Sequence, residues 1–244
     1  MTANVPFLPD ASLDELLALA HKKFKVGFNP VSIGKEKFEV PYISNMTEYV
    51  DRLVQKTQPG KTIQLPLWAK IWPASIMLAH AAGQMPCTGR ESLLEIGAGL
   101  GIPGLVAARH GFSTVISDID DDALIFARIN ILKNNLRDTA TVRKIDVCST
   151  RTDQKFDIII ASEIQYLPNI SQDLVDFLRS SLAPSGTILL ARDAKRKENS
   201  FLTLATEFFQ IQSKKVGFKQ HGSRNATKKQ FQATLYRLIP KPHK

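Results

Sequence analysis

Residues 91–104 read Glu-Ser-Leu-Leu-Glu-Ile-Gly-Ala-Gly-Leu-Gly-Ile-Pro-Gly, and this stretch decides the fold. An apolar run from Ser92 to Ile96 ends in three alternating glycines, and a helical pattern begins near Pro103. The glycines are Gly97, Gly99 and Gly101. A strand, a glycine turn and a helix are typical of a loop that binds a nucleotide cofactor, because glycine reaches positive φ freely and lets ligand atoms approach the backbone. The carboxylate of Glu95 disfavours a pyrophosphate and favours a cofactor with amine or hydroxyl groups.

Two patterns fit these glycines. The dinucleotide fingerprint G-x-G-x-x-G matches from Gly99, but the strand ends at Ile96, so the first glycine of such a loop should be Gly97. Counting from Gly97 puts Ile102 where the third dinucleotide glycine belongs. The better description is Glu-x-Gly-x-Gly-x-Gly. A tight strand-to-helix turn without a ligand is the alternative interpretation.

The length and composition predict one large α/β domain with an N-terminal appendage. The chain has 244 residues, of which 43% are hydrophobic, and this is enough for a sizeable core. No apolar run approaches the roughly 18–20 residues of a membrane span. Residues 1–10 lack the basic and apolar regions of a secretory signal. Cys87 and Cys148 are far apart, and no histidine pair has metal-ligand spacing. We therefore predict a cytoplasmic protein with neither a membrane segment nor a metal.

The charge of the chain is unevenly distributed. The formal net charge is +9, and from Asp193 to the end 12 Lys and Arg residues stand against three acidic residues. A basic surface of this kind favours an acidic partner, either a protein or a nucleic acid. The alternative is a solvated basic face that only aids solubility. Aromatic residues are not interleaved with these charges as a base-stacking platform requires, so nucleic acid is the less favoured partner.

Strand and helix patterns alternate regularly from residue 92. The predicted strands are 92–96, 114–117, 141–145, 156–161 and 187–191. The predicted helices are 103–110, 121–134, 171–182 and 199–209. Strands separated by helix-length segments are typical of right-handed βαβ units and a mainly parallel sheet. The segments 211–220 and 230–238 have no helix between them, so we expect an antiparallel hairpin at the sheet edge.

Residues 1–60 are predicted to form a helical and mixed extension that covers the substrate side of a domain at 61–240. The expected elements are a helix at 12–22, a short strand within 37–42 and a helix at 46–56. Ser12 and Glu15 have the spacing of a capping box at the start of the first helix.

The segment 65–75 reads Leu-Pro-Leu-Trp-Ala-Lys-Ile-Trp-Pro-Ala-Ser. Pro73 fits the first turn of a helix that runs to about residue 82. Trp68 is a candidate wall of the cofactor pocket. Trp72, four residues later, is expected on the same helical side and in the core.

Acidic residues follow two of the predicted strands. Asp118 ends the second strand, where an acid can take both hydroxyls of a ribose. Asp120, Asp121 or Asp122 is expected to cap the next helix or to lie in its first turn. Asp146 ends the third strand and could accept a hydrogen bond from an adenine amine, although a turn aspartate is an equal alternative.

The fourth strand leads into the sequence Ala161-Ser-Glu-Ile-Gln-Tyr-Leu-Pro. In open parallel sheets the ligand lies beyond the carboxyl ends of the strands, so we expect Glu163 and Tyr166 to face the reactive end of the cofactor. A half-buried packing role is the alternative for Tyr166. Arg196, beyond the fifth strand, is either at the substrate entrance or a plain surface residue.

These features together resemble the class I, seven-β-strand S-adenosylmethionine methyltransferases. The segment 95–101 matches the first motif of that superfamily, Asp118 the second, and the terminal hairpin its sixth and seventh strands. The resemblance covers about residues 65–238. It implies an α/β, Rossmann-like, doubly wound sheet of seven strands that is mainly parallel and ends in an antiparallel hairpin.

Within that superfamily the chain is similar to the protein-lysine methyltransferases called methyltransferase family sixteen. Three segments carry the narrower match. They are the Trp-containing segment 67–74, the run Asn130-Ile-Leu-Lys-Asn-Asn135, and the Glu163-x-x-Tyr166 pair after the fourth strand.

The resemblance implies S-adenosylmethionine as cofactor and a protein that carries an acceptor lysine as partner. The implied cofactor-binding residues are Trp68, Glu95, Gly97, Gly99, Gly101, Asp118, Asp146 and Ala161. Glu163 and Tyr166 are the implied catalytic pair, in which Glu163 attracts the incoming ammonium and Tyr166 borders it.

Other functions remain open at this point. The acceptor could be a small-molecule amine or another protein side chain. A nicotinamide-dinucleotide oxidoreductase is disfavoured by Glu95 and by the edge hairpin, and a non-catalytic nucleic-acid-binding module is a further alternative. Methylation of a base amine is disfavoured, because residues 162–165 contain no Pro-Pro where such enzymes carry Asn/Asp-Pro-Pro-Tyr.

Overall fold

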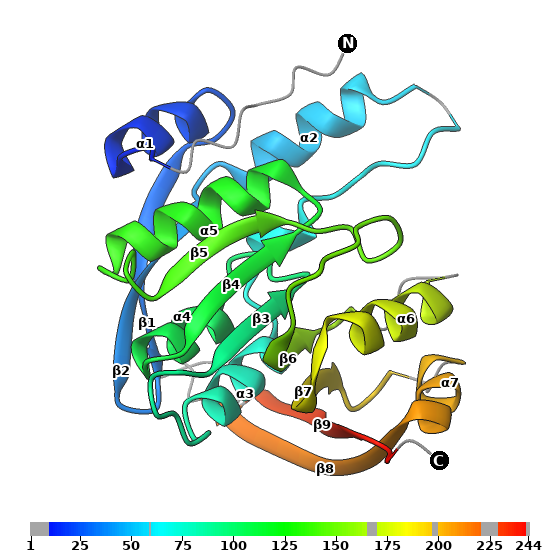
Figure 1. The fold of residues 1–244 in the computed structure, drawn as a ribbon. Helices are drawn as coiled ribbons and strands as arrows, with labels where there is room; N and C mark the ends of the chain where they lie inside the picture. The colour runs from blue at the N-terminus through cyan, green and yellow to red at the C-terminus, as the bar shows by residue number, and fades with distance from the viewer. Residues whose placement is uncertain (1–9, 59, 165–169, 197–199, 221–228, 243–244) are drawn as a thin grey trace.

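A computed structural model describes residues 10–58, 60–164, 170–196, 200–220 and 229–242. Its centre is a seven-stranded sheet in the order β5-β4-β3-β6-β7-β9-β8 (Figure 1). The strands are β3 Ser92–Ile96, β4 Ser113–Asp118, β5 Ala140–Lys144, β6 Phe156–Ser162, β7 Leu182–Asp193, β8 Phe209–Gln220 and β9 Lys229–Pro240. Strands β3 to β7 are parallel, β9 runs antiparallel to β7, and β8 runs antiparallel to β9. The predicted α/β sheet with a terminal antiparallel hairpin is confirmed.

Helices cover both faces of this sheet. The helices are α3 Pro73–Ala82, α4 Ile102–Arg109 and α5 Asp121–Lys133 on one face, and α6 Ser171–Ser181 and α7 Ser200–Phe208 on the other. On β3, Leu93 packs in the cluster that contains α3, whereas Leu94 packs in the cluster that contains α6. Because both faces of the sheet are covered, consecutive residues of its strands are apolar. These apolar runs allowed the strands to be predicted from the sequence.

The N-terminal elements are α1 Leu13–His21, β1 Val26–Ile33, β2 Glu36–Ile43 and α2 Met46–Lys56. Of these, α1 and β2 pack onto α5. Buried side chains of α1 and β2 belong to the same hydrophobic cluster as Phe126 of α5. The predicted capping box is confirmed, because the Glu15 N–H donates to Ser12 Oγ and the Ser12 N–H donates to the Glu15 carboxylate.

One strand of this region was not predicted. The expected short strand at 37–42 is β2, which is longer than expected and pairs antiparallel with β1. Strand β1 was not predicted because it contains Gly27 and Pro30, and both residue types are depleted in strands. The ring of Tyr42 on β2 covers Gly27, where an added Cβ would lie 2.7 Å from the ring. The pairing partner, rather than local propensity, makes this segment a strand.

The expected common helical side for Trp68 and Trp72 is wrong. Trp68 lies in a short 3-10 turn, η1 Leu67–Ala69, and the chain is extended at Trp72 before α3 begins at Pro73. A residue that precedes proline is disfavoured in the α region, which explains the break. The Trp72 Nε1–H donates to the carbonyl oxygen of Leu67 at 3.1 Å and ties the extended stretch back to η1.

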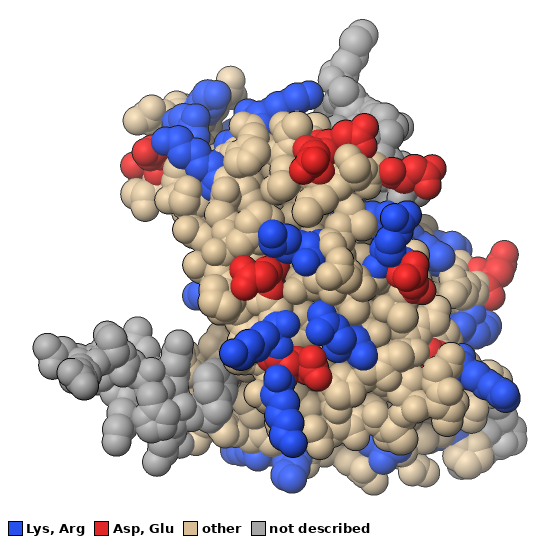
Figure 2. Space-filling view, turned by 90° about the vertical axis from the view of Figure 1, so that its left-hand side faces the viewer, with Lys and Arg blue, Asp and Glu red and all other residues tan. Residues whose placement is uncertain are grey.

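Basic side chains are scattered over the face shown in Figure 2, and acidic side chains lie between them. Among the described residues, no helix is long and apolar enough to span a membrane.

Candidate functional site

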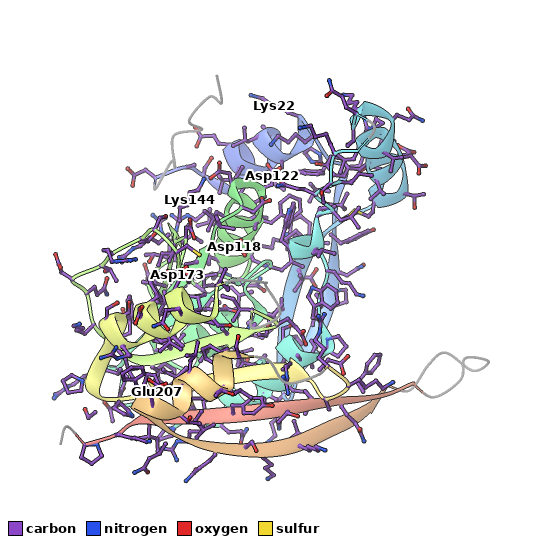
Figure 3. The ribbon with its side chains drawn as sticks, turned by 90° about the vertical axis from the view of Figure 1, so that its right-hand side faces the viewer. Lys22, Asp118, Asp122, Lys144, Asp173 and Glu207 are labelled. Atoms are coloured by element: carbon purple, nitrogen blue, oxygen red, sulfur yellow. The ribbon has the colours of Figure 1, made fainter. Side chains whose placement is uncertain are left out.

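A cavity of about 380 Å³ opens at the carboxyl ends of β3, β4 and β6. Its walls come from the glycine turn after β3, the residues that follow β4, β5 and β6, and the segment from η1 to α3. Figure 3 places Asp118 near the middle of this side of the molecule, below Asp122 of α5 and above Asp173 of α6. The volume is in the range of small-molecule and cofactor sites.

The turn after β3 uses glycine at three left-handed positions. The φ angles are 60° at Gly97, 55° at Gly99 and 71° at Gly101. At Gly99 a Cβ would also lie 2.7 Å from the carbonyl oxygen of Trp68. Since both the backbone angle and the close approach of η1 require a bare backbone, position 99 accepts only glycine.

Asp118 connects this turn to the end of β4. Its Oδ2 accepts a 2.8 Å hydrogen bond from the Gly99 N–H, and its Oδ1 accepts a 3.0 Å bond from the Asp120 N–H. The residue is 9% exposed and lines the cavity. Each carboxylate oxygen has two lone pairs, so acceptor capacity remains for hydroxyl groups of a ligand. The neighbouring Ile119 is 58% exposed and gives the cavity an apolar rim.

The other acids near α5 have structural roles. Asp120 caps α5, because its Oδ1 accepts from the Asp122 and Ala123 N–H groups at 2.8 and 3.1 Å. Burial raises the pKa of Asp120. Asp121 and Asp122 lie in the first helical turn and pair with Lys144 and Lys23. The predicted cap and first-turn roles are confirmed.

Glu95 lies beneath the glycine turn rather than in the cavity wall. It is 1% exposed, and its Oε2 accepts a 2.8 Å bond from the Gly104 N–H in the first turn of α4. Burial, with a further contribution from the Asp118 carboxylate, raises the pKa of Glu95 to about 8. The side chain holds the start of α4 against β3.

Asp146 lines the cavity and organises the turn after β5. Its Oδ1 accepts from the Cys148 N–H at 3.0 Å, and its Oδ2 accepts from Ser149 Oγ at 2.9 Å. These hydrogen bonds lower the pKa of the carboxyl group. The geometry is that of a turn aspartate whose carboxylate still borders the cavity.

Glu163 follows β6 with an unusual backbone. Its φ is 57°, a left-handed value that is uncommon outside glycine, and its side chain is 8% exposed. The Asp193 N–H donates to its Oε1 at 2.6 Å, and Arg196 Nε lies 2.8 Å from its Oε2. Burial raises the pKa of Glu163, while the Asp193 N–H and the Arg196 charge oppose that rise. The Glu163 carboxylate is therefore buried at the cavity wall, and one of its oxygens is fixed by a backbone N–H.

Trp68 joins the cavity to the N-terminal elements. Its ring centroid lies 5.8 Å from that of Phe24 and 4.9 Å from that of Phe126 on α5. Phe24 in turn lies 4.9 Å from Tyr49 of α2. Tilted and edge-on ring contacts of this kind stabilise the fold by more than the burial of their apolar area alone. This aromatic cluster fixes the wall that Trp68 contributes.

The structure brings most of the predicted site residues together. Those that line the cavity are Trp68, Gly97, Gly99, Asp118, Asp146 and Glu163. Glu95, Gly101 and Ala161 are buried behind that lining. Tyr166 lies outside the described residues. Arg196 borders the cavity and pairs with Glu163. The sequence left open whether this residue lies at the substrate entrance or is a plain surface residue.

Comparison with known proteins identifies the family. The profile of the lysine methyltransferase family matches residues 62–208, which include the glycine turn, Asp118 and Glu163. The chain belongs to the lysine methyltransferase family. It is 28% identical to the mouse (Mus musculus) protein N-lysine methyltransferase METTL21A over 189 residues, which is 74% of this chain and 84% of that protein.

Another relative is longer than this chain. The ribosomal protein L11 methyltransferase of Halalkalibacterium halodurans is 26% identical over 202 residues. The match covers 82% of this chain and 61% of that protein, so the chain spans about three fifths of the relative's length.

Solved methyltransferase structures share the fold. An S-adenosylmethionine-dependent methyltransferase from Agrobacterium tumefaciens has a TM-score of 0.57 at 17% identity and covers 88% of this chain and 70% of its own. The N-methyltransferase NodS from Bradyrhizobium japonicum, solved with S-adenosyl-L-homocysteine, has a TM-score of 0.54 at 18% identity. The match covers 82% of this chain and 100% of NodS.

Membership of the lysine methyltransferase family implies S-adenosylmethionine as the cofactor. The residues present fit such a group. The side-chain-free turn at Gly97 and Gly99 leaves room for a close ligand, Asp118 retains acceptor capacity, and Ile119 and Val147 provide apolar walls. Within the described parts of the chain, no group of three or more His, Cys, Asp or Glu side chains is arranged to hold a metal ion.

Proposed function

We propose that this enzyme transfers a methyl group from S-adenosylmethionine to the side-chain nitrogen of a lysine in a protein substrate. The family match supports this reaction, and a relative with the printed name protein N-lysine methyltransferase aligns with three quarters of the chain. When bound, the cofactor supplies a methyl group that is already activated by a sulfonium. The protein's own residues then need to bind, align the nucleophile and exclude water.

On the donor side, the proposed roles follow from the cavity wall. Asp118 would accept hydrogen bonds from the ribose hydroxyls, and the glycine turn would border the methionine portion. Asp146 and the apolar residues Ile119 and Val147 would border the adenine. Trp68 would close the cavity from the side of η1, held by its contacts with Phe24 and Phe126.

On the acceptor side, Glu163 is the proposed orienting carboxylate. Free lysine has a pKa of about 10.4, so the acceptor arrives as an ammonium and has to lose a proton before it can attack. Glu163 Oε1 is held by the Asp193 N–H, so Oε2, which Arg196 Nε contacts at 2.8 Å, is the oxygen that would receive the ammonium. The carboxylate would hold the nitrogen in line while its proton passes to water. Tyr166, predicted to border the ammonium, lies outside the described residues.

The division of the chain is also part of the proposal. We assign residues 61–240 to the methyltransferase domain and residues 1–60 to an extension that covers its substrate side. The contact between Phe24 and Trp68 supports this assignment, because it joins the extension to the cavity wall. The proposed location is the cytoplasm, since both cysteines, Cys87 and Cys148, are free thiols.

The observation that carries the proposed function is the pair of buried carboxylates, Asp118 and Glu163, on one cavity beside the glycine turn. The test is incubation of the purified enzyme with tritiated S-adenosylmethionine and a lysate. Acid hydrolysis of the labelled band should release methyl-lysine, and Glu163→Ala should lower the initial rate of labelling on the order of 100-fold. Label that appears only in nucleic acid, in small molecules or on another amino acid would overturn the proposed acceptor.

A further inference from the structure

Arg196 and Glu163 are connected through Asp193. The Asp193 N–H donates to Glu163 Oε1 at 2.6 Å, and the Arg196 N–H donates to the Asp193 carbonyl oxygen at 3.1 Å. The turn after β7 therefore returns the Arg196 side chain to Glu163, where Nε lies 2.8 Å from Oε2. Both carboxylate oxygens are engaged, one by a backbone donor and the other by a side-chain cation.

These two contacts differ in how easily they can be replaced. Asp193 is the last residue of β7 and its backbone is held by pairing with β9. Arg196 lies beyond the strand end, and its side chain is 38% exposed, against 8% for Glu163. A long and partly solvated side chain can move into water with its charge hydrated. Glu163 cannot leave, because its backbone N–H is bonded to the Ala191 carbonyl oxygen at 2.9 Å.

A cation beside Glu163 stabilises the charged form of this carboxylate. Removing one partner of a largely buried ion pair leaves an uncompensated charge, which is strongly unfavourable. Exchange of one cation for another keeps the carboxylate compensated, provided that the departing guanidinium reaches solvent. Arg196 borders the same cavity as Glu163, so an incoming cation and the guanidinium compete for one place.

We propose that the Arg196 guanidinium occupies the position on Glu163 Oε2 that the acceptor's ammonium takes, so that the acceptor binds by cation exchange. This inference rests on the proposed function, because it requires a cationic acceptor. Arg196 is then a specificity-determining residue. A neutral amide or hydroxyl group cannot replace the guanidinium without leaving the buried carboxylate uncompensated, so neutral acceptors are rejected.

The test measures binding of a lysine side-chain analogue. The wild-type enzyme, saturated with S-adenosyl-L-homocysteine, is titrated with n-butylammonium and, in parallel, with neutral 1-butanol. Arg196→Gln removes the internal competitor, so its half-saturating n-butylammonium concentration should be about three- to tenfold lower. The response to 1-butanol should not change. Arg179→Gln is the matched control, since Arg179 is a partly exposed ion-paired arginine on α6 that does not line the cavity.

Two further arms keep the test decisive. Adding Glu163→Gln to Arg196→Gln should remove the gain, because the competing cations then have no carboxylate. In the wild-type enzyme, the ¹⁵Nε–H resonance of Arg196, assigned by its loss in Arg196→Lys, should move with n-butylammonium and not with 1-butanol. Equal half-saturating concentrations in the wild type and Arg196→Gln, or an unmoved Arg196 resonance, would overturn the proposal.

The result is separable from the proposed function. If methyl-lysine forms in the lysate but Arg196→Gln does not change n-butylammonium binding, the cation-exchange proposal is wrong and the proposed function stands. The expected binding result without methyl transfer to any lysine would leave the exchange in place and remove the protein-lysine acceptor.

Discussion

The Gly99 N–H donates a 2.8 Å hydrogen bond to Asp118 Oδ2, and this bond joins the turn after β3 to the end of β4. The two residues meet because β3 and β4 are parallel neighbours, so their carboxyl ends lie at one edge of the sheet. One carboxylate thereby shapes the glycine turn and also presents lone pairs to the cavity. Cofactor affinity and loop geometry should therefore respond together to substitution at either residue.

Asp118→Ala should weaken binding of S-adenosyl-L-homocysteine by about 1–3 kcal/mol, because it removes a buried, charge-assisted hydrogen-bond acceptor. Isothermal titration calorimetry measures the loss directly. Asp121→Ala is the control, since Asp121 is three residues away but lies outside the cavity and pairs with exposed Lys144. Unchanged affinity in Asp118→Ala would remove this residue from the cofactor site.

Gly99→Ala should destabilise the fold and abolish cofactor binding. The left-handed backbone costs alanine roughly 1–2 kcal/mol, and the new Cβ would in addition lie 2.7 Å from the Trp68 carbonyl oxygen. Gly89→Ala is matched in backbone, with a φ of 84°, but nothing lies within 4 Å of its Cβ. Urea unfolding should show the larger loss for Gly99→Ala, and calorimetry should show normal affinity only for Gly89→Ala. Equal losses would mean that the approach of η1 does not constrain the turn.

The central sheet was predictable because its strands are buried on both faces. The segment 92–96 is a strand over the predicted residues, with Leu93 and Leu94 in contact with opposite layers. Strand β1 was missed because Gly27 and Pro30 break the local pattern, and its conformation depends on pairing with β2. Non-local pairing of this kind leaves no periodic signal in the strand itself.

The candidate site was predictable where its residues end strands. Asp118 and Glu163 were placed from strand position, since parallel strands bring their carboxyl ends to one edge. Arg196 could not be assigned, because its contact with Glu163 depends on the turn made by Asp193. Glu95 was predicted to be a cofactor-binding residue, but its Oε2 accepts a hydrogen bond from the Gly104 N–H beneath the loop. Such a hydrogen bond depends on how α4 packs on β3.

Glu163→Ala should retain cofactor binding and lose turnover. The substitution removes the carboxylate that is proposed to orient the acceptor, and misplacing a reacting group lowers kcat on the order of 100-fold. Affinity for S-adenosyl-L-homocysteine, measured by calorimetry, should stay at the wild-type value. Glu207→Ala, at an exposed position of α7, is the control for general effects of losing an acid. Wild-type turnover in Glu163→Ala would exclude the residue from the mechanism.

The activity of the enzyme should fall at acid pH as Glu163 becomes protonated. Burial raises its pKa above the usual 4.5, the Asp193 carboxylate adds to the rise, and the charges of Arg196 and Arg192 oppose it. Because only the ionised form holds an ammonium, kcat/KM should increase as pH passes upward through this pKa. Arg196→Gln removes an opposing charge, so the acid limb of its pH profile should lie at higher pH. An acid limb that stays in place would show that Arg196 does not act on the ionisation of Glu163.

Glu95 should make the folded protein less stable as pH rises. Burial raises its pKa to about 8, whereas the unfolded chain loses this proton near 4.5, so its contribution is complete below pH 4.5 and is lost as pH rises toward 8. Glu95→Gln keeps an acceptor for the Gly104 N–H but has no proton to lose. Urea unfolding should give similar stabilities for variant and wild type near the acid end. By about pH 8 the free energy of unfolding of Glu95→Gln should exceed that of the wild type by on the order of a few kcal/mol. Glu91→Gln is the control, because hydrogen bonds from Thr88 lower the pKa of Glu91 to about 2, outside this window. Parallel pH profiles for Glu95→Gln and wild type would mean that the buried carboxyl group is ionised throughout.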